Sequence, residues 1–158
     1  MDRVNQIWNH PIYQNELNKL QLLETDREFC RHTPEHFLDV ARLAYIRVLE
    51  ENAPVSKELI YCTALLHDIG RARQYEDGTP HDEAGAVIAE QILKELGFSP
   101  EEIQAIVSAI RGHRAETNQT ILGQLIYRAD KKSRNCFSCK AEPECYWSSA
   151  IIIMTIHY

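Results

Sequence analysis

The stretch from Ser56 to Gly70 constrains this chain more than any other, because it has the pattern of a helix that is apolar on almost every side. A helix with a single apolar stripe can lie on a surface, whereas one that is apolar all round must be surrounded by other elements. Ser56 supplies an N-cap and Gly70 a stop signal. The sequence therefore predicts a central buried helix within a bundle, with apolar positions at Leu59, Ile60, Cys62, Ala64, Leu65, Leu66 and Ile69.

The rest of the chain shows helical periodicity, in segments separated by cap and turn signals. Thr33 and Pro34 form a start signal, Gly97 a stop signal, and a loop after the central helix ends in a turn at residues 77–80. Before the C-terminal tail there is no convincing strand pattern. We therefore expect an all-α fold in a single domain spanning residues 1–158. The predicted helices span residues 11–26, 33–51, 56–69, 82–96, 99–110 and 119–131.

The charge balance narrows the classes of function. The chain has 17 Lys and Arg against 23 Asp and Glu, a formal net charge of −6. General nucleic-acid binders usually carry a basic surface, so we expect no nucleic-acid partner, whereas a small anionic substrate stays compatible if a bound cation reverses the local potential. The sequence shows no secretory signal and no run of about 18 apolar residues, so we expect a cytoplasmic protein with no membrane partner. Assembly into a homo-oligomer stays open.

Imidazole and carboxylate side chains recur at the ends of the predicted helices. His67 and Asp68 close the apolar helix, where a charged aspartate is costly to bury unless it is paired or binds a metal. Antiparallel packing can gather such helix ends at one mouth of a bundle. A mixed nitrogen and oxygen donor set suits Fe, Mn, Zn, Co or Ni rather than calcium. The candidate ligands are His36, His67, Asp68, His81, His113 and Asp130.

Five segments in order carry a resemblance to a known family. HFLDVARLA, ALLHDIGRAR, HDEAGAVIAEQIL, IVSAIRGH and LIYRADK resemble the motifs of the HD-domain superfamily of metal-dependent phosphohydrolases. The resemblance implies an HD-domain helical bundle with its core over residues 30–132 and a short cysteine-rich C-terminal extension over residues 133–158. The ligand pattern most resembles bacterial HD proteins that split dinucleoside tetraphosphates. It departs from the HD-GYP phosphodiesterases, because Arg114 follows His113 and no Gly-Tyr-Pro follows.

The resemblance also implies roles for individual residues. One divalent metal would bind His36, His67, Asp68 and Asp130; a second would bind His81 and His113 and share Asp68. Asp68 and Arg71 would be the catalytic residues. Arg71 is the first choice for contacting the substrate phosphate, because it follows the His-Asp pair by three residues, and Lys131, Arg114 and Arg134 are weaker candidates. The expected activity is hydrolysis of a phosphoester or phosphoanhydride bond, in a nucleotide such as a dinucleoside polyphosphate or a nucleoside monophosphate. The alternative is a metal- or nucleotide-binding regulatory module without turnover.

Cysteines near the C-terminus suggest a second kind of metal site. Cys136, Cys139 and Cys145 form a C-x2-C-x5-C pattern, and Cys30, six residues before His36, is the best candidate for a fourth ligand. Such spacing suits a structural zinc, less often an iron-sulfur cluster, and reduced thiols in a mobile tail are the third reading. Cys62 is expected to be a buried small hydrophobic residue.

The sequence assigns no functional role to three further histidines. His10 and His157 are expected to lie on the surface. His32 stands four residues before His36, but Pro34 starts the helix between them, so the two rings need not share a helical face.

Overall fold

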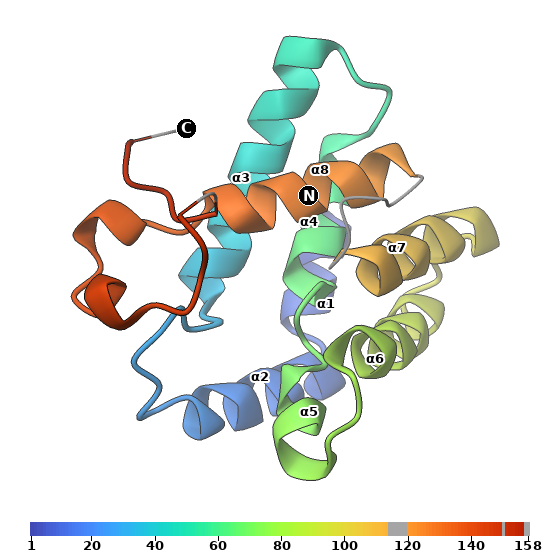
Figure 1. Ribbon diagram of the computed structural model, residues 1–158. Helices are drawn as coiled ribbons and strands as arrows, with labels where there is room; N and C mark the ends of the chain where they lie inside the picture. Colours follow the sequence, from blue (N-terminus) through green and yellow to red (C-terminus); the bar gives the residue numbers. More distant parts are fainter. Residues whose placement is uncertain (114–119, 150, 157–158) are drawn as a thin grey trace.

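The computed structural model describes residues 1–113, 120–149 and 151–156, and these residues form helices joined by short connections (Figure 1). No strand occurs in the described part of the chain, so the predicted all-α class is confirmed. Two single 3-10 turns, η1 (Cys136–Ser138) and η2 (Glu142–Glu144), follow the last α-helix. The α-helices are α1 (Asp2–Trp8), α2 (Pro11–Leu23), α3 (Pro34–Glu51), α4 (Lys57–Leu66), α5 (Arg71–Asp77), α6 (His81–Glu95), α7 (Pro100–Gly112) and α8 (Ile121–Lys132).

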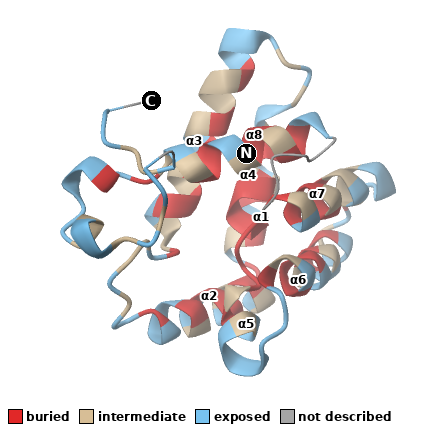
Figure 2. Ribbon diagram, in the orientation of Figure 1, coloured by how far each residue is buried: buried red, intermediate tan, exposed pale blue. Residues whose placement is uncertain are grey.

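Helix α4 is the central buried helix that its sequence predicts. It contacts α1, α3, α7 and α8, and Figure 2 shows it buried inside the bundle. Ser56 caps it by accepting a hydrogen bond from the Leu59 N–H at 3.2 Å. The helix ends at Leu66 rather than Ile69, so the His67-Asp68 pair lies in the turn that follows.

The apolar core has two parts, and α4 contributes to both. The larger part joins α4 to α1, α2, α5, α6, α7 and the first turn of α3, with Tyr13, Phe37 and Ile92 among its fully buried side chains. The smaller part joins α4 to α3 and α8. Cys62 is fully buried on α4, which confirms its predicted role as a small hydrophobic residue. The bundle therefore has two halves, and their helix ends converge beside the C-terminal end of α4.

Two helices occur where the sequence predicted none. Helix α1 buries only Val4 and Ile7, too few apolar positions to reveal a period. Helix α5 replaces the loop predicted after Gly70; it buries only Ala72, and Gly78 ends it with a φ of +81°. Smaller differences concern boundaries: α2 ends three residues early, α6 begins at His81, and α7 runs two residues further. Residue 119, the predicted start of the last helix, lies outside the described residues.

Gly70 controls how closely α6 approaches the turn after α4. A Cβ atom at Gly70 would collide with the backbone of His81 and Gly85, at 2.8 Å from the Gly85 Cα atom. The missing side chain thus lets the start of α6 lie directly against the His67-Asp68 turn. The sequence assigned Gly70 only a stop role, and the structure adds this close approach.

The C-terminal segment packs against the loop that precedes α3 (Figure 1). Arg134 donates a hydrogen bond from Nη1 to the Arg31 carbonyl oxygen at 3.3 Å. The Phe137 N–H donates to the Ile153 carbonyl oxygen at 3.0 Å, which folds the segment back on itself. Among the helices of the described residues, none has the length and hydrophobicity to cross a membrane.

Candidate metal centre

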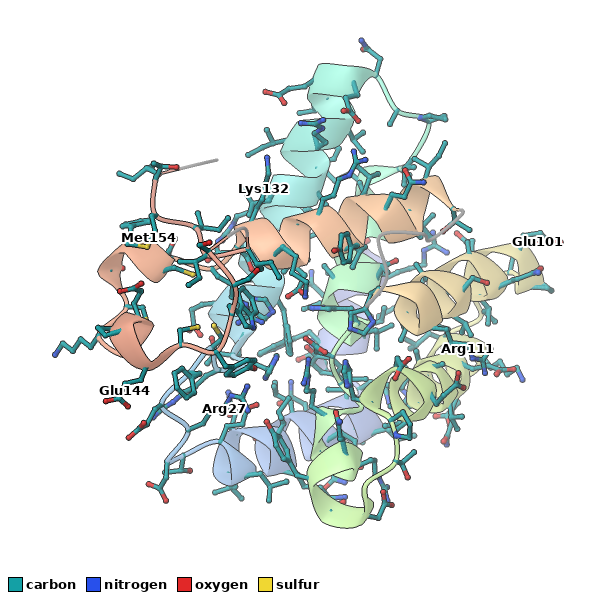
Figure 3. The ribbon with its side chains drawn as sticks, in the orientation of Figure 1. Arg27, Glu101, Arg111, Lys132, Glu144 and Met154 are labelled. Atoms are coloured by element: carbon teal, nitrogen blue, oxygen red, sulfur yellow. The ribbon has the colours of Figure 1, made fainter. Side chains whose placement is uncertain are left out.

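The structure brings the six predicted ligands together in one buried cluster. Their side chains come from the ends of five helices: His36 in the first turn of α3, the His67-Asp68 turn after α4, and three more from α6, α7 and α8. Thr33 accepts a hydrogen bond from the His36 N–H at 3.4 Å, which fixes His36 in that first turn. In Figure 3, the labelled Glu101 and Arg111 extend outward from α7, and both are exposed.

Four of the ligands form one group around a common point. His36, His67, Asp68 and Asp130 each offer an atom within 4.8 Å of the others. His36 Nε2 lies 3.4 Å from Asp130 Oδ1, and His67 Nε2 lies 3.2 Å from Asp68 Oδ2. Two ligands that are each about 2.1 Å from a tetrahedral ion lie about 3.4 Å apart. The group therefore has the spacing that a metal ion requires.

A second group shares Asp68 with the first. Its other members are His81 and His113, whose Nε2 atoms lie 3.3 Å and 3.4 Å from Asp68 Oδ1. The two imidazole Nε2 atoms are 3.3 Å apart. The two oxygens of Asp68 thus face different groups, Oδ2 toward His67 and Oδ1 toward His81 and His113. This is the placement of a carboxylate that can bridge two ions.

Hydrogen bonds to backbone carbonyls orient two of the rings. His67 Nδ1 donates to the Ala64 carbonyl oxygen at 2.7 Å, and His113 Nδ1 donates to the Ile110 carbonyl oxygen at 2.5 Å. Each bond places the Nδ1 proton on the outer side of the ring and turns Nε2 toward the cluster. Metal-binding histidines usually have this outer partner, which fixes the tautomer and the ring plane.

Side-chain oxygens orient the other two rings in the same way. His81 Nδ1 lies 2.7 Å from Gln74 Oε1. His36 Nδ1 lies 3.1 Å from Ser133 Oγ, whose own proton goes to the Asp130 carbonyl oxygen at 2.7 Å. Gln74 comes from α5, the helix that sequence analysis missed. That helix therefore has a place in the site, because it supplies the partner of His81.

Burial and charge give the rings different proton affinities. Burial lowers the pKa of His36 to about 4, although Asp130 acts in the opposite direction. Burial also acts to lower the pKa of His67, but Asp68 and Asp130 outweigh it and raise that pKa to about 9. Burial acts to raise the pKa values of Asp68 and Asp130, but it is outweighed and both lie well below the usual range. The charges of His67, His32 and Arg71 lower the pKa of Asp68, and hydrogen bonds from His36 and His67 lower that of Asp130. Both carboxylates are thus ionised, which is the form in which they can bind a metal cation.

Comparison with known proteins decides the family. A model of the HD domain matches residues 33–135. The chain belongs to the HD-domain family. It is therefore a metal-dependent phosphohydrolase, and the fold agrees: the crystal structure of a predicted HD superfamily hydrolase from an uncultured Thermotogales bacterium superposes with a TM-score of 0.65 at 25% identity. That match covers 98% of this chain and 88% of the other.

Relatives in sequence differ greatly in length. An uncharacterized protein of Clostridium beijerinckii is 46% identical over 158 residues, the full length of both chains. Ribonuclease Y of Desulforudis audaxviator is 30% identical over 121 residues, and a bifunctional uridylyltransferase/uridylyl-removing enzyme of Cereibacter sphaeroides is 30% identical over 107 residues. The matched regions are only 22% and 10% of those two enzymes. The HD domain is thus a part of larger enzymes in these relatives.

Three cationic side chains border the HD centre. Arg71 Nε lies 3.0 Å from Asp68 Oδ1, and Lys131 Nζ lies 2.8 Å from Asp130 Oδ2. Arg134 is buried, and its Nη2 lies 3.0 Å from His36 Nε2 and 3.3 Å from Asp130 Oδ1. Arg134 is thus closer to the centre than its low ranking from sequence implied. Arg114, the remaining predicted substrate contact, lies outside the described residues.

His32 belongs to the site although sequence analysis set it aside. It is buried; its Nε2 lies 3.5 Å from Asp68 Oδ2, and its Nδ1 lies 2.6 Å from Glu24 Oε1. The His32 N–H also donates to Glu24 Oε2 at 2.7 Å. The ring reaches Asp68 from the loop before α3 rather than from a helical face, so the helix start at Pro34 does not keep it out of the site. A glutamate eight residues before a histidine is too weak a signal to have revealed this pair.

The sequence prediction is also wrong for His10, which lies in a different region of the protein. It is buried rather than on the surface, and its Nδ1 accepts a hydrogen bond from the Ile12 N–H at 3.3 Å as the N-cap of α2. Its Nε2 lies 3.1 Å from Glu95 Oε2. His10 is therefore a structural residue. His157 lies outside the described residues.

Proposed function

We propose that this HD-domain protein hydrolyses a phosphoester or phosphoanhydride bond of a small nucleotide at a two-metal centre. The proposal rests on the position of Asp68, because its two carboxylate oxygens face two separate ligand groups. Two-metal hydrolases use such a bridging carboxylate to hold a pair of ions at a short, fixed separation. A single-metal site would need only one of these groups.

The donor atoms fit transition-metal ions. His67 Nε2 is buried and makes no hydrogen bond of good geometry, although Asp68 is close, so a cation would satisfy it. We assign one ion to His36, His67, Asp68 and Asp130, and a second to His81 and His113 with Asp68 shared. Imidazole and carboxylate ligands suit Fe, Mn, Zn, Co or Ni. When bound, such ions supply Lewis-acid activation of water and of the phosphoryl group.

The chain's own cations bind and orient the substrate. Arg71 and Lys131 are partly exposed and each pairs with a carboxylate of the centre, so both can exchange that partner for a phosphate oxygen. Arg71 offers a planar fork that suits phosphate, whereas Lys131 acts as a point charge. We propose Arg71 as a catalytic residue because it would stabilise charge on the transferred phosphoryl group. Arg114 remains a proposed substrate-binding residue because of its positive charge alone.

A small nucleotide fits the chain better than a long nucleic acid. Relatives named ribonuclease Y and uridylyl-removing enzyme point, by those names, to RNA and uridylyl groups. The net charge of −6 disfavours a long polyanion. We therefore propose a dinucleoside polyphosphate or a nucleoside monophosphate as substrate. We also propose a cytoplasmic location, because all five cysteines are free thiols.

A product survey tests the proposal. The Mn-, Fe- and Co-loaded protein would be incubated with nucleoside monophosphates, dinucleoside polyphosphates and a short RNA, with the products separated by chromatography. We expect turnover of a small nucleotide that disappears in Asp68→Ala and persists in a control variant of the exposed Asp26, Asp26→Ala. Equal activity in wild type and Asp68→Ala would contradict the proposal. Nucleotide binding without turnover would favour the regulatory alternative.

A further inference from the structure

Four cysteines, one of them more than 100 residues before the other three, line one cavity of about 250 Å³ beside the HD centre. Cys30 comes from the loop before α3, and the other three come from the C-terminal segment that folds against that loop. His36 and Arg134 line the same cavity from the side of the metal centre. In Figure 3, the labelled Glu144 and Met154 mark this C-terminal segment. None of the cysteines forms a disulfide.

The backbone repeats one local arrangement around the cavity. Cys139 directly follows the 3-10 turn η1, and Cys145 directly follows η2, with the same extended backbone conformation at both residues. The Cys139 N–H donates to the Cys136 carbonyl oxygen at 3.0 Å, which closes the turn of the C-x2-C pair. A tight turn between two cysteines, with a third after a similar turn, is typical of cysteine zinc sites.

Two arginine side chains bond to the loop that carries Cys30, and one of them, Arg134, joins that loop to the C-terminal segment. Arg134 donates to the Arg31 carbonyl oxygen at 3.3 Å, and Arg27 donates to the Cys30 carbonyl oxygen at 3.1 Å. Burial raises the pKa of the Cys30 thiol; Arg134 lowers it, and Cys136 and Cys139 raise it further, so these charges act on one another. The guanidinium group of Arg134 would offset part of the negative charge of a thiolate cluster.

We propose that Cys30, Cys136, Cys139 and Cys145 bind one structural Zn²⁺ ion that is separate from the HD centre. Four thiolates complete a tetrahedral shell, and soft sulfur ligands favour zinc. Within the described residues, the groups whose ligand atoms already lie within 4.8 Å of one another are the two His/Asp groups. The cysteine site is therefore more open, and zinc closes it by drawing the four sulfurs together as their protons leave.

Such an ion would also support the catalytic side. Cys136 stands two residues after Arg134 and three after Ser133, and both of these residues contact the His36 ring. A zinc tie at Cys136 would hold this short connection in place. Within the described residues, neither ligand group of the HD centre includes a cysteine, so we assign the cysteines a structural rather than a catalytic role.

Cobalt replacement tests the proposal in the full-length protein. Co²⁺ bound to sulfur gives an intense near-ultraviolet charge-transfer band, which Co²⁺ bound to histidine and aspartate does not. We expect this band in wild type and also in Asp68→Ala, where the HD centre is impaired. A wild-type protein with a full HD centre but no sulfur band would overturn the proposal, and this result would leave the proposed hydrolase intact.

Zinc analysis with cysteine variants supplies the second arm. We expect Cys30→Ser and Cys139→Ser each to lose about one zinc ion per chain, whereas Cys62→Ala, which changes the cysteine outside the cavity, loses none. If the serine variants do not fold, alkylation of the native wild type replaces them: bound zinc should protect four thiols, and chelation should expose them. Full zinc content in Cys30→Ser, unprotected thiols, or iron and sulfide in place of zinc would each contradict the proposal.

Discussion

The HD centre and the cysteine cavity are neighbours, yet they are built in opposite ways. In the HD centre the ligands stand at helix ends, all are buried, and each of the four imidazoles has an oxygen partner at Nδ1. In the cavity the ligands stand on a loop and beside 3-10 turns, with Cys139 exposed and Cys136 buried. The helical site is organised before any ion binds, whereas the cysteine site would be completed by its ion.

This difference indicates what a bound metal would contribute to each of the two sites. Where packing and hydrogen bonds already fix the ligands, an ion adds chemistry and little order. Where ligands lie on loops, binding free energy is used partly to order the chain, so metal binding and local folding become one process. Loss of metal should therefore remove activity at the HD centre and local structure at the cavity.

The largest expected effect comes from the residue shared by both ligand groups. Asp68→Ala removes one ligand from each group. It also takes away the carboxylate that faces four buried imidazoles, those of His32, His67, His81 and His113. The loss of an outer partner of a metal ligand costs about 10- to 100-fold in activity, so the loss of a bridging ligand should cost more than about 100-fold. Steady-state rates with Mn²⁺ give the value, and circular dichroism should show that the helices persist.

Gly70→Ala tests whether the close packing of α6 against the turn after α4 positions the ligands of the HD centre. Its new Cβ atom meets the backbone of His81 and Gly85, which cannot move aside as a flexible side chain can. We expect a loss of about 1–3 kcal/mol in the free energy of unfolding, the usual cost of overpacking, together with weakened binding at the His81 side. Gly85→Ala is the matched control, because its Cβ atom would make ordinary contacts at 3.4 Å or more. Equal stability of the two variants would contradict this view of the packing.

His32 and His10 form a natural pair for comparing a site residue with a structural one. Both are buried and each faces a glutamate, but only the His32 ring touches a ligand of the HD centre. We expect His32→Gln to lower activity about 10- to 100-fold, as loss of an outer partner does. His10→Gln should lower the melting temperature and leave kcat/KM near the wild-type value. The comparison fails if both variants have the same activity.

Zinc removal should affect the cavity more than the centre. An organomercurial that binds thiols should release one zinc ion and speed proteolytic cleavage within residues 133–158, while activity falls less than about tenfold, the lower limit for an outer partner. Mass spectrometry of the fragments locates the cuts. A chelator that empties only the HD centre should stop turnover without new cuts, and the reverse pattern would refute the contrast between the sites.

The smallest effect is a pH dependence of the metal-free protein. The pKa of His67 is raised to about 9 in the folded chain, above the 6.5 of the free side chain. The protonated ring, which faces the charged Asp68 and Asp130, thus stabilises the fold fully below pH 6.5, and this contribution is lost as the pH rises through 9. Because a metal replaces this proton, metal affinity should increase from pH 7 to 9. Urea unfolding at pH 7 and pH 9, with His67→Gln as reference, measures the loss of stability. Calorimetry at the same two pH values measures the gain in metal affinity.

Sequence patterns predicted the residues whose role depends on position along one helix. Thr33 and Ser56 mark helix starts because each is an N-cap residue. These starts place His36 in the first turn of α3 and His67 at the end of α4. The same reasoning missed His32, because its place depends on Glu24 and on the path of a loop. Helix α5 was not predicted, because its one buried residue, an alanine, gives no apolar periodicity. The contact between Gln74 and His81 was therefore not predicted either. Contacts between distant loops and short helices have no local signature.

Diffraction from crystals soaked in Mn²⁺ tests the central claim most directly, since anomalous scattering locates the ions themselves. The account predicts two peaks, one on each side of the Asp68 carboxylate and each about 2.2 Å from its imidazole ligands. One peak would be shared with His36 and His67, the other with His81 and His113. A single peak that leaves one oxygen of Asp68 without an ion, or ions bound away from Asp68, would contradict it.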